Sequence, residues 1–169
     1  MKYVSTRDNS KEYNFEQVFI KGLADDGGLY VPISLKKYSP QELQELKKLS
    51  YNELSTEIIN LFSSDFISKE ELSSLIKNSY STFREKEVVK LSNVGEIKLL
   101  ELFHGPTLAF KDVAMQFIGN LYEYYLGKNN KKINIVVATS GDTGAAAIDA
   151  IKAKSNLNIF VLHPNNRIS

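Results

Sequence analysis

The second half of the chain alternates short apolar runs with helical patterns, and this alternation restricts the fold more than any other feature. Three apolar runs have the length of a strand, at Ile97–Leu102, Ile133–Ala138 and Leu157–Leu162. Two helical patterns lie between them, Phe110–Leu126 and the alanine-rich Thr143–Lys152. Strands that are apolar almost throughout, separated by helices, predict parallel βαβαβ units in an open sheet. The predicted fold class is therefore α/β.

The first half of the chain carries amphipathic segments with the spacing of helices. Asn14 is placed to cap a short helix, and large apolar residues recur at helical intervals over residues 40–49 and 51–62. Ser68 is followed three residues later by Glu71, which is the spacing of a capping box and predicts the start of a further helix. These patterns indicate a small helical region whose apolar stripes pack together.

The change of texture near residue 95 predicts two regions, a mostly helical one over residues 1–94 and an α/β one over residues 95–169. Charges are balanced, with 21 Lys and Arg against 20 Asp and Glu, so nothing points to nucleic acid or an anionic membrane. No apolar stretch has the length of a membrane span or the pattern of a signal peptide. There is no cysteine and only two histidines, so we expect a cytoplasmic protein without a catalytic metal.

A turn between the first strand and the first helix of the α/β region carries a lysine in an unusual setting. Lys111 follows the apolar residues 108–110 at the expected helix start. The positive end of the helix dipole and the apolar neighbours both favour a neutral amine, which can react with a cofactor aldehyde. Two ordinary interpretations stay open: the amine reaches solvent, or it pairs with Asp112. We interpret His104, earlier in the turn, as a hydrogen-bonded structural group rather than a base.

The turn after the second strand has the composition of an anion site. Gly141 and Gly144 permit close backbone approach, and the hydroxyls of Ser140 and Thr143 are donors suited to a carboxylate or phosphate. Asp142 would repel an anion unless it caps the helix or accepts a hydrogen bond from a cofactor hydroxyl. The dinucleotide and P-loop spacings are absent. An anion site and an ordinary helix start are equally compatible with these residues.

Three stretches together resemble the threonine synthases that carry an additional N-terminal region. They are Tyr3–Arg7 with Gly22–Pro32, Phe103–Asp112, and Ala138–Ala146. The resemblance implies a fold like that of the tryptophan synthase β subunit, with pyridoxal 5'-phosphate bound covalently by Lys111. It further implies conversion of O-phosphohomoserine and water to threonine and phosphate, the last step of threonine biosynthesis.

The same resemblance implies roles for further residues. The substrate α-carboxylate would be held by four residues, Ser140, Gly141, Thr143 and Gly144. Asp142 would lie near the ring hydroxyl of the cofactor. Arg167 and Ser169 would meet the substrate phosphate, since arginine suits oxyanions.

The chain departs from the family pattern after its third apolar run. The family carries a later glycine-rich loop for the cofactor phosphate and a polar residue for the pyridine nitrogen, and neither precedes Ser169. We therefore expect a fragment that is inactive and binds the cofactor poorly alone, with exposed apolar faces on its sheet. The alternatives are another pyridoxal-phosphate lyase or dehydratase of this fold, a non-catalytic protein derived from it, and an anion-binding module without a covalent cofactor.

Overall fold

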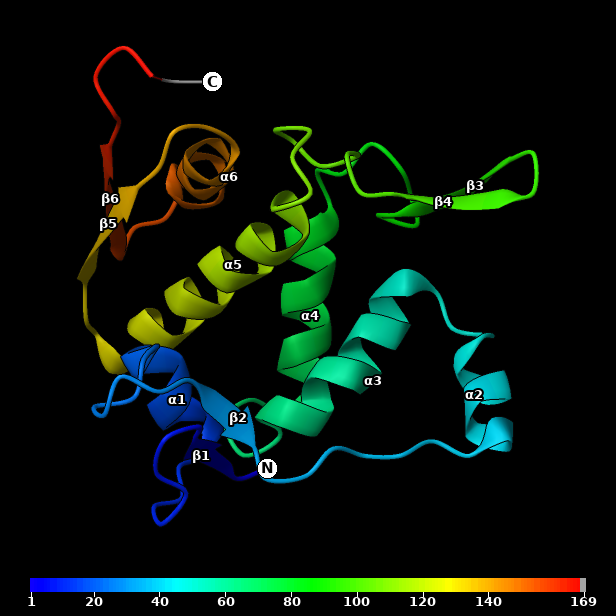
Figure 1. The fold of residues 1–169 in the computed structure, drawn as a ribbon, viewed down its shortest axis with the longest axis horizontal. Helices are drawn as coiled ribbons and strands as arrows, with labels where there is room; N and C mark the ends of the chain where they lie inside the picture. Colours follow the sequence, from blue (N-terminus) through cyan, green and yellow to red (C-terminus); the bar gives the residue numbers. More distant parts are fainter. Residues whose placement is uncertain (168–169) are drawn as a thin grey trace. The chain divides into compact units, whose positions relative to one another are not determined.

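The computed structural model describes residues 1–167 and shows two compact units, Met1–Ser74 and the residues from Leu75 onward (Figure 1). The division falls inside one helix, α4 (Lys69–Tyr80). Residues 75–94 therefore belong to the second compact unit by their contacts. The domain boundary expected between residues 94 and 95 stays a prediction.

The first unit consists of short helices and one pair of very short strands. Its elements are β1 (Tyr3–Ser5), α1 (Phe15–Lys21), β2 (Tyr30–Pro32), α2 (Pro40–Leu46), α3 (Tyr51–Ser63) and the beginning of α4. The sequence predicted all four helices, although α2 ends at Leu46 rather than Leu49. It did not predict β1 and β2, which pair antiparallel.

Reciprocal capping bonds explain where these helices begin. The Asn14 side chain accepts a hydrogen bond from the Gln17 N–H at 2.9 Å, and the Gln17 side chain accepts one from the Asn14 N–H at 2.9 Å. Helices α2 and α3 start with the same arrangement. At α4, Ser68 and Glu71 exchange equivalent bonds, as their spacing predicted. Each pair satisfies N–H groups that have no partner inside the helix.

The second unit contains the predicted alternation of helices and strands. Its elements are the end of α4, β3 (Lys90–Val94), β4 (Ile97–Glu101), α5 (Asp112–Asn129), β5 (Ile133–Ala138), α6 (Asp142–Ile151) and β6 (Leu157–Leu162). Strands β5 and β6 are parallel and in register along their whole length. With α6 between them they form a βαβ unit, so the α/β class is confirmed.

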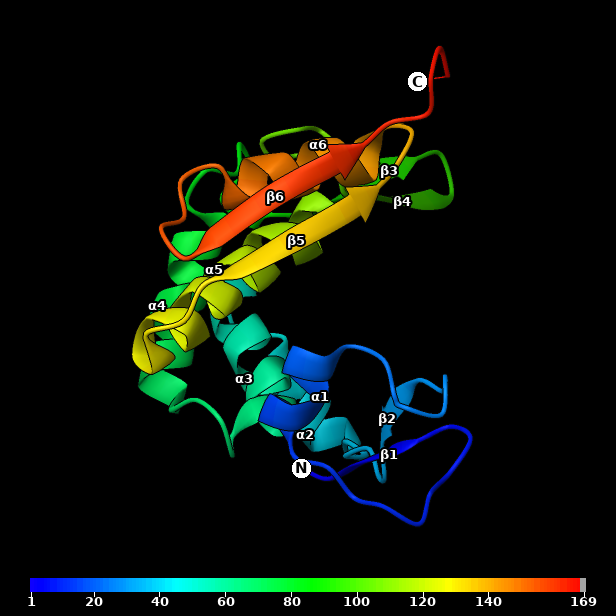
Figure 2. The same cartoon turned by 90° about the vertical axis from the view of Figure 1, so that its left-hand side faces the viewer.

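The two helices α5 and α6 cover the same face of the β5–β6 sheet (Figures 1 and 2). Ile135 and Val137 point to this helical layer and line a cavity with it. On the opposite face Val136, Phe160 and Leu162 are 64%, 56% and 60% exposed. The strands are therefore covered on one face within the described residues, and the expected exposed apolar face is present.

The strand at Ile97 requires a correction. We expected it to join the parallel sheet, but within residues 1–167 β4 pairs only with β3, as an antiparallel hairpin. The physical reason is the two-residue turn at Gly95 and Glu96, where Gly95 has a φ of +62°. A glycine in the left-handed region at the first turn position joins adjacent antiparallel strands closely. Within the described residues the parallel sheet is thus β5 and β6 alone.

No helix within residues 1–167 combines the length and the apolar composition that crossing a bilayer requires.

Helices α5 and α6 approach closely because small residues face each other. A Cβ atom on Gly119 would lie 2.8 Å from the Ala150 carbonyl oxygen, which is backbone and cannot turn away. One turn earlier on α5, Gln116 donates a hydrogen bond to the Asp149 carboxylate across the same interface at 2.8 Å. Close packing of this kind fixes the position of one helix along the other.

We expect Gly119→Ala to destabilise the protein by about 1–3 kcal/mol, because its methyl group would overlap the backbone of α6. Gly127→Ala, in the same helix, is the matched control. A Cβ there would meet only the Asn156 side chain at 3.9 Å, so the better helix propensity of alanine should leave stability unchanged or raised. Urea unfolding of both variants measures the difference, and equal losses would contradict this packing.

Candidate active site

The two turns predicted to carry chemistry lie at one end of the α5–α6 layer. Met115, one helical turn after Lys111, and Thr143, at the start of α6, line the same apolar cavity of about 190 Å³. Figure 2 shows the arrowheads of β5 and β6 at the end where the chain enters α6. Residues from the first turns of both helices therefore line one cavity, and α6 begins just after the carboxyl end of β5. Open α/β sheets bind their ligands there.

Lys111 is the residue from which α5 begins, and its side chain is half-buried. Its Nζ lies 4.3 Å from the centroid of the Phe110 ring. Among residues 1–167 this amine makes no ion pair or hydrogen bond. The amine is thus close to an aromatic surface at a helix N-terminus and is not committed to a partner. Its neutral state stays a prediction.

The expectation that Asp112 could pair with Lys111 is wrong, because the Asp112 carboxylate has other partners. Its Oδ2 accepts a hydrogen bond from the Thr107 N–H at 2.8 Å, and its Oδ1 accepts one from Thr107 Oγ1 at 2.7 Å. Asp112 is completely buried. A Cβ on Gly105 would lie 2.4 Å from the Asp112 Cβ, so only glycine fits there. We call this arrangement of Gly105, Thr107 and Asp112 the clasp.

His104 holds the other end of the same turn. Its Nε2 lies 2.8 Å from Glu101 Oε2, and its carbonyl oxygen accepts a hydrogen bond from the Arg84 N–H at 2.9 Å. Glu101 also accepts a hydrogen bond from the Ser92 hydroxyl on β3. The hydrogen bond from Ser92 lowers the pKa of Glu101 most, and the contact with His104 lowers it further. Both keep the carboxylate charged. His104 is a hydrogen-bonded group that ties the turn to the β3–β4 hairpin.

The second turn presents open backbone donors. Gly141 precedes α6 without a side-chain cap, and within the described residues the N–H groups of Asp142 and Thr143 donate to no protein acceptor. Asp142 is exposed and is the first residue of α6, so it does not cap the helix as one interpretation had it. Ser140 is exposed, and Gly144 is buried. Two free N–H groups at a positive helix end form a setting suited to an anion.

Among residues 1–167, no hydrogen bond or ion pair brings Arg167 to this site. Arg167 is exposed, and its N–H donates to the Pro164 carbonyl oxygen at 3.3 Å in a turn. Ser169 lies outside the described residues.

Comparison with known proteins assigns the family. Residues 2–80 match the family model described as threonine synthase N terminus. Threonine synthase of Schizosaccharomyces pombe is 41% identical over 179 residues, covering 100% of this chain and 35% of that protein. The solved structure of PLP-bound threonine synthase from Brucella melitensis is 40% identical with a TM-score of 0.93, covering 100% of this chain and 37% of that one. The chain belongs to the threonine synthase family.

The family relation extends through both units, and the fold is that of the threonine synthase structures. The chain spans about a third of the length of the relatives it matches. Some relatives have a different name: for example, threonine synthase-like 2 of Xenopus laevis is 40% identical over 169 residues, covering 99% of this chain and 36% of that protein. Membership in the threonine synthase family therefore does not by itself assign the reaction.

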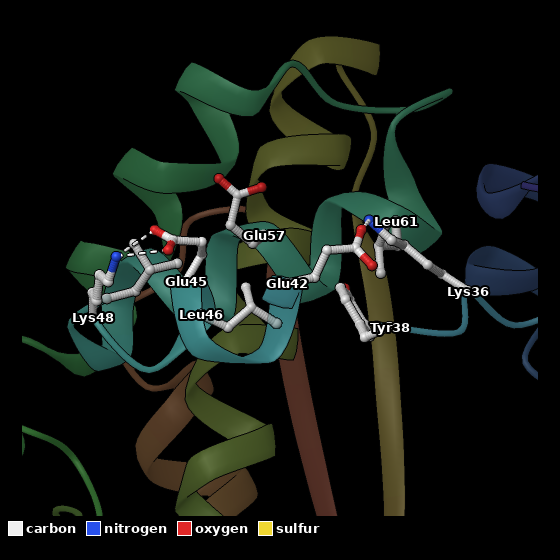
Figure 3. A pocket seen from close by; sticks show the side chains of 9 residues that line it. Lys36, Tyr38, Glu42, Glu45, Leu46, Lys48, Glu57 and Leu61 are labelled. Atoms are coloured by element: carbon white, nitrogen blue, oxygen red, sulfur yellow. Dashed lines mark hydrogen bonds and ion pairs between the residues drawn. The ribbon is translucent and has the colours of Figure 1, made fainter. Parts of the chain in front are cut away.

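A second hollow lies in the first unit between α2 and α3 and has a volume of about 450 Å³ (Figure 3). Its charged rim is already paired: Glu42 binds Lys36 at 3.0 Å, and Glu45 binds Lys48 at 2.6 Å. Bonds from Ser39 and Lys36 lower the pKa of Glu42 to about 2. These side chains neutralise one another and leave no free charge for a ligand. We therefore do not assign a catalytic or ligand-binding role to this hollow.

Sequence reasoning missed the clasp and the Glu101–His104 contact. A signal was present, because Thr107 and Asp112 flank the lysine and an acidic residue at a helix start can bind N–H groups ahead of it. The sequence did not show which of the two neighbours, Lys111 or Thr107, the carboxylate would bind. Only the path of the turn decides that.

The start of α6 yields a test of local packing. A Cβ on Gly144 would lie 2.5 Å from the Thr139 Cγ2, so Gly144→Ala should destabilise the protein by about 1–3 kcal/mol. The double variant T139S/G144A removes that methyl group and keeps the hydroxyl that accepts from the Gly141 N–H, so it should recover most of the loss. Denaturant unfolding of both variants and of T139S measures the coupling. Additive effects would show that the contact is not the cause.

Proposed function

We propose that the complete gene product carrying this chain is a pyridoxal-phosphate-dependent threonine synthase. Its reaction would convert O-phosphohomoserine and water to threonine and phosphate. The observation that carries the proposal is the setting of Lys111, an amine at the start of α5 whose acidic neighbour is bound by Thr107. A 40% identical relative has been solved with PLP bound. The cytoplasmic location stays a prediction.

The residues at this end of the sheet fit the cofactor by their chemistry. An aldehyde needs an amine that is not held in an ion pair, and Lys111 meets that condition among residues 1–167. Anionic groups need converging donors, and the first N–H groups of α6 supply them. Gly144 lets α6 begin directly against the end of β5, because any side chain there would strike Thr139.

Each residue then has a role in the proposed reaction. Lys111 Nζ would hold the cofactor through its aldehyde group. When bound, the cofactor supplies an electron sink for negative charge at the substrate Cα. As a free amine, Lys111 Nζ would carry protons to and from the substrate Cα and Cβ. The other residues of the site would bind and orient the substrate.

The second turn would hold the parts that every amino-acid substrate shares. We propose that the α-carboxylate binds this turn through backbone N–H groups and hydroxyls of four residues, Ser140, Gly141, Thr143 and Gly144. Asp142 would lie near the cofactor ring hydroxyl. Arg167 and Ser169 would meet the substrate phosphate. The exposed position of Arg167 leaves its guanidinium accessible for such a contact.

A second function within the same chemistry is favoured by one observation. The 40% identical relative named threonine synthase-like 2 matches almost the whole of this chain. A similar sequence therefore occurs in proteins with different names. Another pyridoxal-phosphate lyase acting on a different phosphorylated or hydroxylated amino acid is therefore the alternative. Product analysis separates the two, because only a threonine synthase releases both threonine and phosphate from O-phosphohomoserine.

The proposal is tested by borohydride reduction of the complete gene product with pyridoxal phosphate, followed by peptide mass mapping. We expect one reduced adduct on Lys111, its loss in K111R, and its retention in K132R, which changes an exposed lysine beyond α5. An unlabelled Lys111 in the unsubstituted protein would refute covalent cofactor binding. Assaying the 169 residues beside the complete gene product tests the separate expectation that they are inactive alone.

A further inference from the structure

We propose that Thr107 is a positioning residue, whose hydroxyl fixes the Lys111 amine by binding the Asp112 carboxylate. This inference rests on the proposed function of Lys111. Thr107 itself touches neither cofactor nor substrate in this account. It acts through the backbone of the turn in which Lys111 lies.

The geometry of the clasp closes the turn into a ring. Asp112 is the first residue of α5, and its side chain reaches back five residues to bind both the N–H and the hydroxyl of Thr107. Lys111 is the last residue inside that ring. Two further backbone bonds, from the Leu108 N–H to the Gly105 oxygen at 3.2 Å and from the Asp112 N–H to the Ala109 oxygen at 3.0 Å, cross the turn. The Lys111 Cα is thus held relative to the axis of α5.

Backbone strain at Leu108 shows that the ring is held against a local preference. Leu108 has a φ of +67°, in the left-handed region that residues with a Cβ rarely adopt, and its side chain is 51% exposed. Burial of the side chain therefore does not explain the conformation. A strained residue persists only where the surrounding contacts over-determine it. The clasp supplies those contacts.

The Thr107 hydroxyl is the part of the clasp that can be removed without removing the fold of the turn. The backbone bond to Oδ2 can remain in any variant of residue 107 except proline, whereas Oδ1 loses its donor when the hydroxyl is absent. Because Asp112 is fully buried, water cannot easily replace that donor. The carboxylate should then shift and carry the neighbouring Lys111 with it. A misplacement of about 1 Å costs about 100-fold in a reaction that depends on orientation.

The test compares T107V with T107S in the complete gene product freed of cofactor. The measured quantity is the rate at which added pyridoxal phosphate forms a reducible adduct on Lys111, normalised to the total amount of protein in the same sample. We expect T107V to slow the Lys111 rate by about 10-fold to 100-fold, and T107S, which keeps the hydroxyl, to restore it to within about twofold. T107A serves in the same comparison if T107V does not fold.

A structural effect is separated by T56V, which removes a buried threonine hydroxyl bonded to the Asn52 oxygen at 2.8 Å in α3. It should lower the melting temperature without changing the normalised Lys111 rate. The inference is overturned if T107V labels at the unsubstituted rate, if T107S is as slow as T107V, or if T56V is equally slow. Absence of the adduct in the unsubstituted protein refutes the proposed function instead, and the inference with it.

Discussion

One buried carboxylate sets the local structure on which the candidate site depends. Asp112 has no exposed surface, and a polar group in that position must be hydrogen-bonded or it opposes folding. The two donors of Thr107 meet this need, and the positive end of α5 adds to it. The chain between them is therefore forced into a tight turn. Lys111 lies in that turn, so the hydrogen bonds that one buried side chain requires determine where the amine is presented.

The packing of α5 on α6 extends this local constraint to the second turn. Gly119 allows α5 to approach the backbone of Ala150, and Gly144 allows α6 to begin against Thr139 at the end of β5. Neither position tolerates a methyl group without displacement of a neighbour. The amine of one turn and the open N–H groups of the other are consequently held by close-packed backbone. Rigid packing behind a site allows its groups to act without reorganising.

Local patterns predicted the elements of the fold, and tertiary contacts decided what local patterns could not. Strands β5 and β6 begin and end where the apolar runs do, because burial of one face follows directly from composition. Strand β3 was missed since Lys90–Val94 is mostly polar and exists through pairing with β4. Lys111 stood out by its helix start, yet its relation to Asp112 was misjudged. The donor that binds a buried carboxylate depends on the backbone path of the turn. Sequence periodicity does not predict that path.

The two turns present groups that suit parts common to many substrates. These residues therefore identify a family more readily than a substrate. The Lys111 amine and the N–H groups of α6 suit an aldehyde and a carboxylate, which are the groups that all reactions of a pyridoxal-phosphate amino-acid enzyme have in common. Discrimination between substrates needs groups that meet the side chain, and differential contacts there set specificity. A threonine synthase and a threonine synthase-like protein can therefore share this segment closely. The distinction between them should lie in whatever receives the phosphate rather than in the clasp or the glycine turn.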